Sequence, residues 1–520
     1  MLRRLMLLCL FIFPFTVSAQ EEAFAMIMLL RGHEQPIKGL TISPDGQWIA
    51  SWSSIDGDPG ELFLWDVTTG EPLDLNVAVL HWMHRFGTKP DQIYPPAKID
   101  HVRFSPDSRW LAVLNDPELL RLWNLQTGEG WAVYTGFCDC TAFRTPQTLI
   151  FSPNSAYLAE LNANGDLMLL DLTGDAPVRI EHEFQPDADS PTPITTVAFS
   201  PDSTLLGAIQ SDYERISPGI SKVVKLFALK TGESLLDYSF DDGYTGDFIT
   251  FSPDGKSLLA ASSREGRLFL LDDLNDPLTV FFGWVEEISF SPNSQLIAGV
   301  MTYDPSLGIV YLGDTTDGIM HQELKSYGIA SINHADFYFL PDSRPIYAIQ
   351  HPAGTTITAF NPEWIPELDP AGTLEMRVNP ANNYVAILDG TNLSLFDTGG
   401  DPAPLITLAD PALDAEFFAD GERLATYSGR LIAIYGRPDN EHPALPYALV
   451  VGQVETAGIQ LRSLPDLAAT GLGYVLQGEV LVGGVAASGE FAYLPEYDGW
   501  VRIGADYLHV EVENLPVLNP

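Results

Sequence analysis

A four-residue turn signal, Ser-Pro-Asp-Gly or a close variant, recurs nine times along this 520-residue chain. Each copy separates two apolar stretches, and the copies begin at residues 43, 105, 152, 200, 252, 291, 340, 379 and 418. The eight intervals between the first and last copies average about 47 residues, a period typical of folds that stack one small supersecondary unit many times. The repeat therefore sets the architecture before any single residue is considered.

Each repeat unit is predicted to hold four short strands. An alternating strand precedes the turn, as in residues 99–104, and a strand of small apolar residues follows it, as in 110–114. A third strand resembles residues 62–66, and a Thr-Gly pair such as Thr69-Gly70 marks the next hairpin. Such a sheet cannot bury both faces alone, so the units stack in a ring. The sequence predicts an all-β fold with a single large β-propeller, for which we count nine repeat units and expect eight or nine blades.

Ring closure has a candidate strand near the N-terminus. The last unit, residues 413–436, supplies only three strands, whereas the strand-like residues 24–30 precede the first full unit. Pairing of these segments would hold the two ends of the propeller together and explain why an exported propeller needs no disulfide. We therefore predict a propeller over residues 20–437 in which residues 24–30 complete the last blade.

Two dipeptides give the repeats a family resemblance. Residues 37–437, together with Gly32-His33 and Trp65-Asp66, resemble a WD-repeat (WD40) β-propeller. Eight units lack the Gly-His pair and seven replace the tryptophan, so the match widens to TolB-type and other periplasmic propellers that share the Ser-Pro-Asp-Gly turn. The usual buried His-Ser-Asp-Trp hydrogen-bond set is therefore not expected throughout. The resemblance implies the fold, and it leaves the function open because this fold carries many functions.

The N-terminus predicts export. Arg3 and Arg4 precede an apolar run, and Val17-Ser18-Ala19 ends it with small residues. We predict a signal peptide over residues 1–19, cleaved after about Ala19, and a secreted, periplasmic or cell-surface protein. A retained signal anchor is the alternative. Cys138 and Cys140 then remain as the only thiols, either free or in a strained disulfide, with a metal or redox role as the alternative.

The charge excludes some partners. A formal net charge of −42 repels nucleic acid and anionic membrane surfaces. It is compatible with simple solubility of a secreted protein and also with a basic ligand. No later segment is apolar enough to span a bilayer, and we expect a monomer.

A second module follows the repeats. Residues 438–446 are rich in proline and charge and are predicted to form a linker. Within 447–520, the Arg-Ser-Leu-Pro segment at 462–465, the strand pair at 476–482 and Gly499-Trp500-Val501 resemble bacterial-type SH3-like domains, small β-barrels. That resemblance implies a cell-wall or peptide-binding unit. Its candidate ligand contacts are Arg462, Tyr497, Trp500 and Tyr507, with a core role as the alternative for Trp500 and Tyr507 and a structural role for Arg462.

Catalytic and metal motifs are missing from the sequence. It holds no Gly-x-Ser-x-Gly elbow, no second histidine after His33-Glu34 for a zinc helix and no Gly-rich phosphate loop. Acidic loop residues such as Asp241 and Asp242 carry the oxygen ligands that calcium prefers, but their spacing is not that of a calcium-binding loop. We therefore expect no cofactor, no metal and no catalytic residue.

One long connection is the main candidate contact region of the propeller. Residues 76–98 exceed what a blade needs, and long loops often carry binding. Its candidate ligand contacts are His81, Trp82, His84, Arg85 and Tyr94. Packing of this aromatic segment over the propeller rim is the alternative. Residues 186–193 and 212–221 are further candidate contact loops.

Two functional classes fit these observations. The first is a secreted non-enzymatic binding or scaffold protein, whose propeller loops recognise a protein, peptide or glycan while the SH3-like module tethers it to a cell wall or partner. The second is a quinoprotein-like or lactonase-like enzyme with its active site in the central channel. We favour the first, because the repeats show no recurring inward-facing ligand of the kind that such enzymes use.

Overall fold

The structure is a computed structural model, which describes most of the chain after residue 23. The described residues are 24–53, 60–73, 75, 80–83, 99–115, 119–134, 148–162, 165–180, 193–210, 222–240, 248–261, 265–282, 284–304, 307–315, 320–327, 334–351, 354–359, 375–388, 392–399, 404–409, 411–412, 414–439, 441–445, 449–454, 459–465, 469–475, 478–486, 488, 490–503, 508–509 and 516–518. The predicted signal peptide, Cys138 and Cys140 lie outside them. No helix among the described residues is long and apolar enough to cross a membrane.

The described residues between 25 and 436 form nine β-sheets, here named A to I. Sheet A contains β34 (Asp414–Phe417), β35 (Leu424–Ser428), β36 (Leu431–Gly436) and β1 (Ala25–Arg31). Sheet B contains β2 (Ile37–Ile42), β3 (Trp48–Ser53), β4 (Leu62–Asp66) and β5 (Pro72–Leu73). Sheet C contains β7 (Ile99–Phe104), β8 (Trp110–Asn115), β9 (Leu119–Asn124), β10 (Glu129–Tyr134) and β6 (Leu80–Met83).

The other six sheets repeat this plan. Sheets D and E contain β11 (Thr148–Phe151), β12 (Tyr157–Leu161), β13 (Leu167–Asp171) and β14 (Val178–Arg179), then β15 (Ile194–Phe199), β16 (Leu205–Gln210), β17 (Lys222–Ala228) and β18 (Ser234–Phe240). Sheets F and G contain β19 (Phe248–Phe251), β20 (Ser257–Ala261), β21 (Glu265–Leu270) and β22 (Asp273–Phe282), then β23 (Trp284–Phe290), β24 (Leu296–Asp304), β25 (Leu307–Asp314) and β26 (Met320–Tyr327). Sheets H and I contain β27 (His334–Phe339), β28 (Pro345–His351) and β29 (Gly354–Ala359), then β30 (Glu375–Val378), β31 (Tyr384–Leu388), β32 (Asn392–Asp397) and β33 (Ile406–Ala409).

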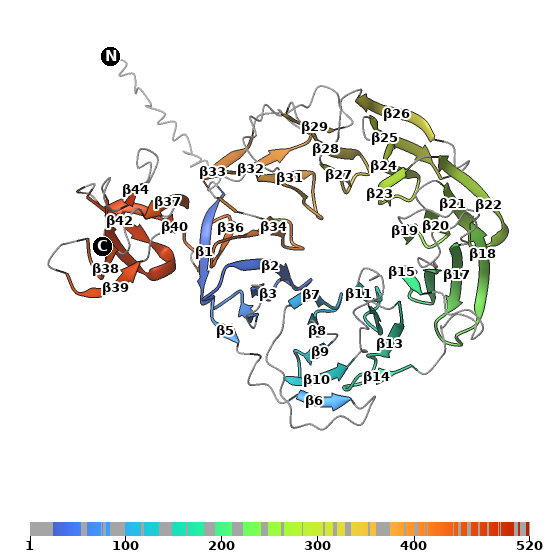
Figure 1. Ribbon diagram of the computed structural model, residues 1–520, viewed down its shortest axis with the longest axis horizontal. Coiled ribbons are helices and arrows are strands. Elements are labelled where there is room, and N and C mark those ends of the chain that lie inside the picture. The colour runs from blue at the N-terminus through green and yellow to red at the C-terminus, as the bar shows by residue number, and fades with distance from the viewer. Residues whose placement is uncertain are drawn as a thin grey trace, which may run out of the picture.

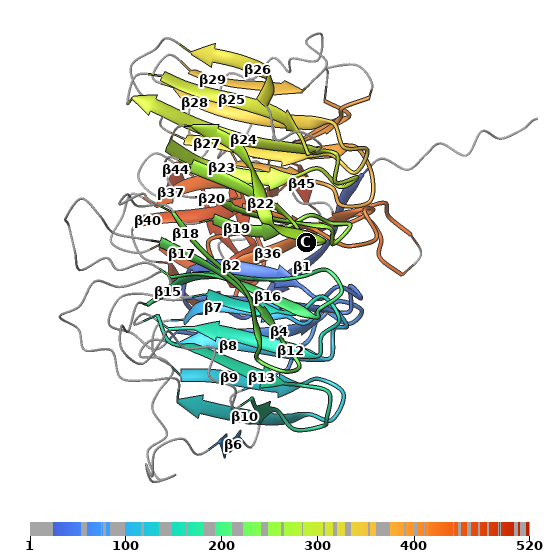
Figure 2. The same ribbon diagram turned by 90° about the vertical axis from the view of Figure 1, so that its right-hand side faces the viewer.

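The sheets form a closed ring, as the sequence predicts. The inner strands β2, β7, β11, β15, β19, β23, β27, β30 and β34 contact one another in that order, and β34 contacts β2 again. Figure 1 looks along the axis of this ring, and Figure 2, turned by 90°, shows many strands running roughly along that axis. Separate buried clusters lie between neighbouring sheets, such as the one that joins Trp110 of sheet C to Leu158 of sheet D. The architecture is therefore a β-propeller.

The closing strand is confirmed. Strand β1 pairs antiparallel with β36, from Ala25 opposite Gly436 to Arg31 opposite Leu431, with a bulge between Met26 and Met28. Met26 packs on one side of sheet A, whereas Ile27 and Leu30 pack on the side that faces sheet B. The first described strand and the last strand of the ring therefore share one sheet.

The first serine of each turn fixes its shape. In the first turn, the N–H of Gly46 donates to the carbonyl oxygen of Ser43 at 2.7 Å. The Ser43 hydroxyl donates to Asp45 Oδ1 at 2.6 Å and accepts from the N–H of Trp48 at 2.9 Å. The corresponding contacts recur at Ser105, Ser152, Ser200, Ser252 and Ser291. Because these serines are buried, their hydroxyls satisfy backbone groups that water cannot reach.

The fourth turn residue links one sheet to the next. It has a positive φ of 58° to 70° in eight turns, at Gly46, Ser108, Ser155, Ser203, Gly255, Ser294, Ser343 and Gly421. For a residue with a Cβ, this left-handed conformation costs about 1 kcal/mol or more of conformational free energy. Each of the five serines accepts a hydrogen bond of 2.9 to 3.1 Å from the N–H of the third residue in the preceding turn, the donors being Asp45, Asp107, Asn154, Asp254 and Asn293. The serine copies of the turn therefore join neighbouring sheets, in a way that glycine copies cannot.

The C-terminal residues form a separate all-β module. One sheet contains β40 (Gly478–Val482), β37 (Val450–Val454) and β44 (Leu508–His509). The other contains β39 (Gly471–Val475), β38 (Ile459–Arg462), β43 (Gly499–Arg502), β42 (Phe491–Leu494), β41 (Gly484–Ala486) and β45 (Val517–Leu518), and the short 3₁₀ helix η2 (Pro495–Tyr497) lies between β42 and β43. The two sheets enclose a core that includes Val454, Val482 and Leu494.

This module is fixed against sheet A. Arg31 donates to the Tyr493 hydroxyl at 3.3 Å, and another of its nitrogens lies 3.2 Å from Asp498 Oδ1. Leu449 and Leu481 belong to the same buried cluster as Leu431 of β36. In the predicted linker, the N–H of Leu445 donates to the carbonyl oxygen of Met26 at 2.7 Å. The module therefore rests on the outer side of the closing sheet, as Figure 1 shows.

Candidate functional site

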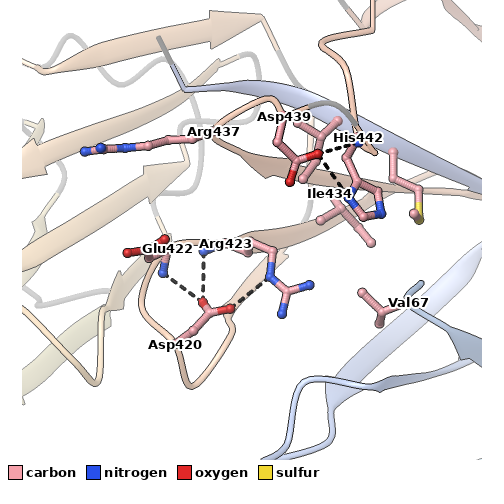
Figure 3. A pocket seen from close by; sticks show the side chains of 10 residues that line it. Val67, Asp420, Glu422, Arg423, Ile434, Arg437, Asp439 and His442 are labelled. Atoms are coloured by element: carbon pink, nitrogen blue, oxygen red, sulfur yellow. Dashed lines mark hydrogen bonds and ion pairs between the residues drawn. The ribbon is translucent and has the colours of Figure 1, made fainter. Parts of the chain in front are cut away.

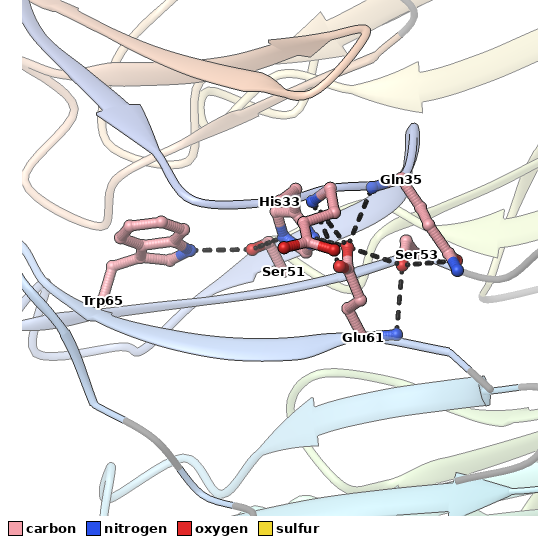
Figure 4. Close-up of polar contacts among 7 residues, drawn as sticks. His33, Gln35, Ser51, Ser53, Glu61 and Trp65 are labelled. Atoms are coloured by element: carbon pink, nitrogen blue, oxygen red, sulfur yellow. Dashed lines mark hydrogen bonds and ion pairs between the residues drawn. The ribbon is translucent and has the colours of Figure 1, made fainter. Parts of the chain in front are cut away.

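Sheet B holds a buried polar network around His33. His33 Nε2 lies 2.7 Å from the Ser51 hydroxyl, which also accepts from Trp65 Nε1 at 2.8 Å (Figure 4). His33 Nδ1 lies 3.0 Å from Glu61 Oε2. The expected His-Ser-Asp-Trp set therefore forms in this sheet, with glutamate in the place of aspartate.

The charge of this network is settled by burial and hydrogen bonds. Burial lowers the pKa of His33, so the imidazole is neutral at pH 7. Burial acts to raise the pKa of Glu61, but hydrogen bonds from His33 and from the N–H groups of Gln35 and Glu34 hold that pKa below its usual range. With every member hydrogen-bonded inside sheet B, the network serves the fold.

The inner strands carry a different kind of polar site. In each unit, one position lies a single residue before the last residue of the inner strand, and it is only partly buried or exposed in all nine. Its occupants from sheet B around to sheet A are Thr41, Arg103, Ile150, Ala198, Thr250, Ser289, Tyr338, Arg377 and Glu416. The ionisable occupants, Tyr338, Arg377, Glu416 and Arg103, fall on sheets H, I, A and C. These sheets are neighbours in the ring except that sheet B, with the uncharged Thr41, lies between A and C. One arc of the ring is therefore charged at this level and the other arc is neutral.

We name Arg103, Glu375, Arg377, Asp414 and Glu416 the inner-strand cluster. Arg377 lies 3.1 Å from Glu375 Oε2 on its own strand and 2.5 Å from Asp414 Oδ1 on β34. Glu416 Oε1 accepts from the N–H of Ile42 at 3.2 Å across the seam to sheet B. The side chains of Glu375 and Asp414 are 36% and 38% exposed, whereas Glu416 is partly buried, so the cluster reaches solvent mainly through the first two carboxylates.

Burial changes the ionisation of this cluster. It raises the pKa of Glu416 to about 7, with a further contribution from the charge of Asp414 that Arg103 opposes. Burial lowers the pKa of Arg377, but the charges of Asp414 and Glu375 outweigh it, so that the net shift is upward. Burial also raises the pKa of Tyr427, on β35, to about 12. The pKa of Glu416 therefore lies near neutral pH, so this carboxyl takes up or releases its proton in that range.

A cavity of about 280 Å³ lies where the segment after β36 crosses sheet A. Met28 and Ile434 form part of its wall, and Val67 of sheet B closes one side (Figure 3). Arg423 enters it from the last turn, where Asp420 Oδ2 accepts from its Nε at 2.9 Å. His442 lies on the opposite side of the cavity, and its backbone N–H donates to Asp439 Oδ1 at 2.6 Å. Two charged pairs, Arg423 with Asp420 and His442 with Asp439, thus line this cavity.

The candidate contacts of the long connection are only partly within the described residues. His81 and Trp82 lie in β6, which pairs parallel with β10 as a fifth strand, so residues 80–83 are strand where we expected a loop. His84, Arg85 and Tyr94 lie outside the described residues. A contact role for this segment stays a prediction.

The candidate contacts of the C-terminal module are placed differently from an exposed aromatic surface. Trp500 is 5% exposed and packs with Tyr493, Phe491 and Leu518. The guanidinium of Arg430 lies 4.8 Å from the ring centre of Tyr497, at the contact with the propeller. Trp500 thus occupies the core, the alternative weighed above, and has little surface for a ligand.

Arg462 has local partners. It donates to Gln460 Oε1 at 2.7 Å and to the carbonyl oxygen of Ala469 at 3.4 Å, as a structural residue does. Tyr507 lies outside the described residues. Among the described candidates, Arg462 lies opposite Trp500 across the β38–β43 pair, whereas Tyr497 lies at the contact with the propeller.

The inner-strand cluster was missed by the search for catalytic motifs, although the repeat itself marks it. Counting back from each turn aligns Arg103, Arg377 and Glu416 at one structural position. Three charged side chains at a position that elsewhere holds Ile, Ala, Thr, Ser or Tyr are the available signal. A search for one identical recurring ligand does not find them.

Comparison with known proteins finds one family match, in the first part of the propeller. Residues 25–66 match the model of the family described as WD domain, G-beta repeat. The match runs from β1 to the end of β4 and includes His33, Ser51 and Trp65. Together with the sheets in cyclic contact, it supports a WD40-type β-propeller. No curated protein matches the chain.

Several solved structures are similar to this chain at low identity. The Dos1 propeller is 13% identical, with a TM-score of 0.44, over 80% of this chain and 96% of the other. A eukaryotic initiation factor is 14% identical, with a TM-score of 0.43, over 78% and 89%. The β-propeller domain of Cps50 (Swd1) from Myceliophteria thermophila is 13% identical, with a TM-score of 0.37, over 79% and 99%.

Proposed function

We propose that this protein is a secreted, non-enzymatic binding scaffold, built from a nine-bladed propeller and an SH3-like module. Its propeller recognises a protein, peptide or glycan, and the C-terminal module tethers it to a cell wall or partner. The inner-strand cluster is the observation that carries the binding role. WD40 propellers generally bind proteins, so a protein is the partner that we favour.

Charged side chains at a partly buried position carry a desolvation cost. Partly buried ion pairs seldom add net stability, because desolvation offsets the attraction between the charges. The neutral arc of the ring shows that the fold tolerates Ile150 or Ala198 at the same position. Charges kept at Arg377 and Glu416 are therefore better explained by recognition than by stability.

Capture from the native cell envelope tests this binding role. The mature chain and a variant carrying Arg103→Gln and Glu416→Gln are immobilised side by side, after circular dichroism has shown the same fold in both. A component retained by the first and lost by the second is the expected result. Equal retention by both contradicts the assignment of binding to this cluster.

The tether and the absence of catalysis need separate measurements. The mature chain should pellet with isolated cell wall, whereas a chain ending at residue 445 should remain soluble. Pelleting of both would place the tether in the propeller. Elemental analysis and absorbance should find no stoichiometric metal or quinone, and finding either would favour the enzyme hypothesis.

A further inference from the structure

Glu416 differs from the other carboxylates of the inner-strand cluster in its partners. Glu375 and Asp414 share the guanidinium of Arg377. Glu416 forms no ion pair within the described part of the chain, and its hydrogen-bond partners are the N–H of Ile42 at 3.2 Å and the side chain of Thr41. Because an ionised carboxylate can accept about four hydrogen bonds, it has capacity left for a donor from outside the chain.

The charge balance selects the sign of that donor. With Glu416 ionised, three carboxylates face two guanidinium groups, so the cluster carries one unbalanced negative charge. A single positive group restores neutrality, whereas an anion would add to the repulsion. The formal charge of −42 also draws cations toward the molecule over long range.

We propose that the inner-strand cluster receives a lysine or arginine side chain of the protein partner, with the Glu416 carboxylate as its principal acceptor. The inference rests on the proposed binding function and adds the chemistry of the partner. The ionisable groups that act on this acceptor are Asp414 on its own strand and Arg103 on β7. Arg377 and Glu375 on β30 and Tyr427 on β35 interact with Asp414 in turn. Of these, Arg103 is the exposed cation that competes with the incoming one.

The binding is coupled to a proton. A cation stabilises the ionised form of Glu416, and the pKa of that carboxyl is about 7 in the free protein. The competent form therefore rises from roughly a tenth at pH 6 to roughly nine tenths at pH 8, which predicts a roughly ten-fold gain in affinity. A proton is released on binding near pH 7, because the bound carboxyl stays ionised.

Isothermal titration of the full mature chain with a pentalysine peptide tests this coupling. Titrations at pH 7 in two buffers of different ionisation enthalpy count the released protons, and titrations at pH 6 and 8 give the affinity ratio. Glu416→Gln should abolish both the proton release and the pH dependence. Glu422→Gln removes the same charge from an exposed turn of sheet A and should keep both.

A second variant makes the test independent of one substitution. Arg103→Gln removes the cation that lowers the pKa of Glu416, so the midpoint of the pH dependence should move upward. Absence of pentalysine binding overturns the inference, as does proton release that survives in Glu416→Gln. Displacement of the peptide by calcium in wild type but not in Glu416→Gln overturns it in favour of a metal site. In each of these cases, a partner captured through the cluster would leave the proposed function standing.

Discussion

The serine at the fourth turn position predicts different effects on stability for two substitutions at the same site. Ser155 has a φ of 60° and accepts from the N–H of Asp107 at 2.9 Å. Ser155→Ala removes the hydrogen bond, worth about 1 kcal/mol, and keeps the left-handed strain. Ser155→Gly removes the same bond but relieves about 1 kcal/mol of strain. We expect alanine to lower the free energy of unfolding by about 1 kcal/mol and glycine to leave it nearly unchanged.

The reciprocal experiment uses a glycine turn. Gly255 has a φ of 69°, and the nearest atom to a Cβ built there is Pro201 Cδ at 3.9 Å, so a side chain fits. Gly255→Ala should cost about 1 kcal/mol through strain alone. Gly255→Ser suffers the same strain but places a hydroxyl beside the preceding turn, where Asp202 holds the donor position. It should therefore exceed the alanine variant in stability by about 1 kcal/mol.

Urea denaturation followed by tryptophan fluorescence measures these differences. Midpoints can be compared directly if the slopes of the transitions are unchanged. Two results would contradict these roles of the fourth turn residue: Ser155→Gly as unstable as Ser155→Ala, or Gly255→Ser no more stable than Gly255→Ala. The first outcome would show that backbone strain at this position does not affect stability, and the second would show that the hydrogen bond between turns does not.

Three further predictions concern closure, ionisation and docking. Deletion of residues 20–30 removes the burial of Met26, Ile27 and Leu30, which is worth roughly 5–9 kcal/mol, so the melting temperature should fall sharply. An unchanged melting temperature would show that the closing strand is not needed for stability. Glu416→Gln should stabilise the protein more at pH 8 than at pH 5. The reason is that the pKa of Glu416 is raised to about 7, so between pH 4.5 and 7 the folded state keeps a proton that the unfolded state has lost, and wild-type stability falls as the pH rises. Equal shifts of the urea midpoint at both pH values would contradict this. Arg430→Ala removes the ion pair to Glu496 and the contact with Tyr497, so limited proteolysis should cut between the propeller and the C-terminal module sooner than in wild type, and equal cleavage rates contradict the docking.

The local features of this fold could be predicted from the sequence. The turn depends on neighbouring residues, since Ser43, Asp45 and Trp48 bond within six positions, and its repetition therefore indicates the repeat units directly. The closing strand could be predicted because the last unit lacked one strand. Both inferences needed only the chain order and the hydrogen-bonding needs of a sheet.

The candidate site depends on contacts that chain order hides. Glu416 bonds Ile42 across 374 residues, and this contact exists only because sheet A lies beside sheet B in the closed ring. The same holds for Arg31 and Asp498, whose pairing requires a particular docking of the C-terminal module. Residue types alone left Trp500 either a ligand contact or a core residue, and its burial depends on how β38, β42 and β43 pair.

The closing strand also has a consequence for the order of events during synthesis. Residues 25–31 leave the ribosome first among the propeller strands, yet their partner in β36 ends at residue 436. For the time needed to make the intervening chain, Met26, Ile27 and Leu30 have no sheet to join. The propeller can therefore complete its last sheet only after nearly the whole ring has been made, and this apolar segment must be kept from other strand edges until then.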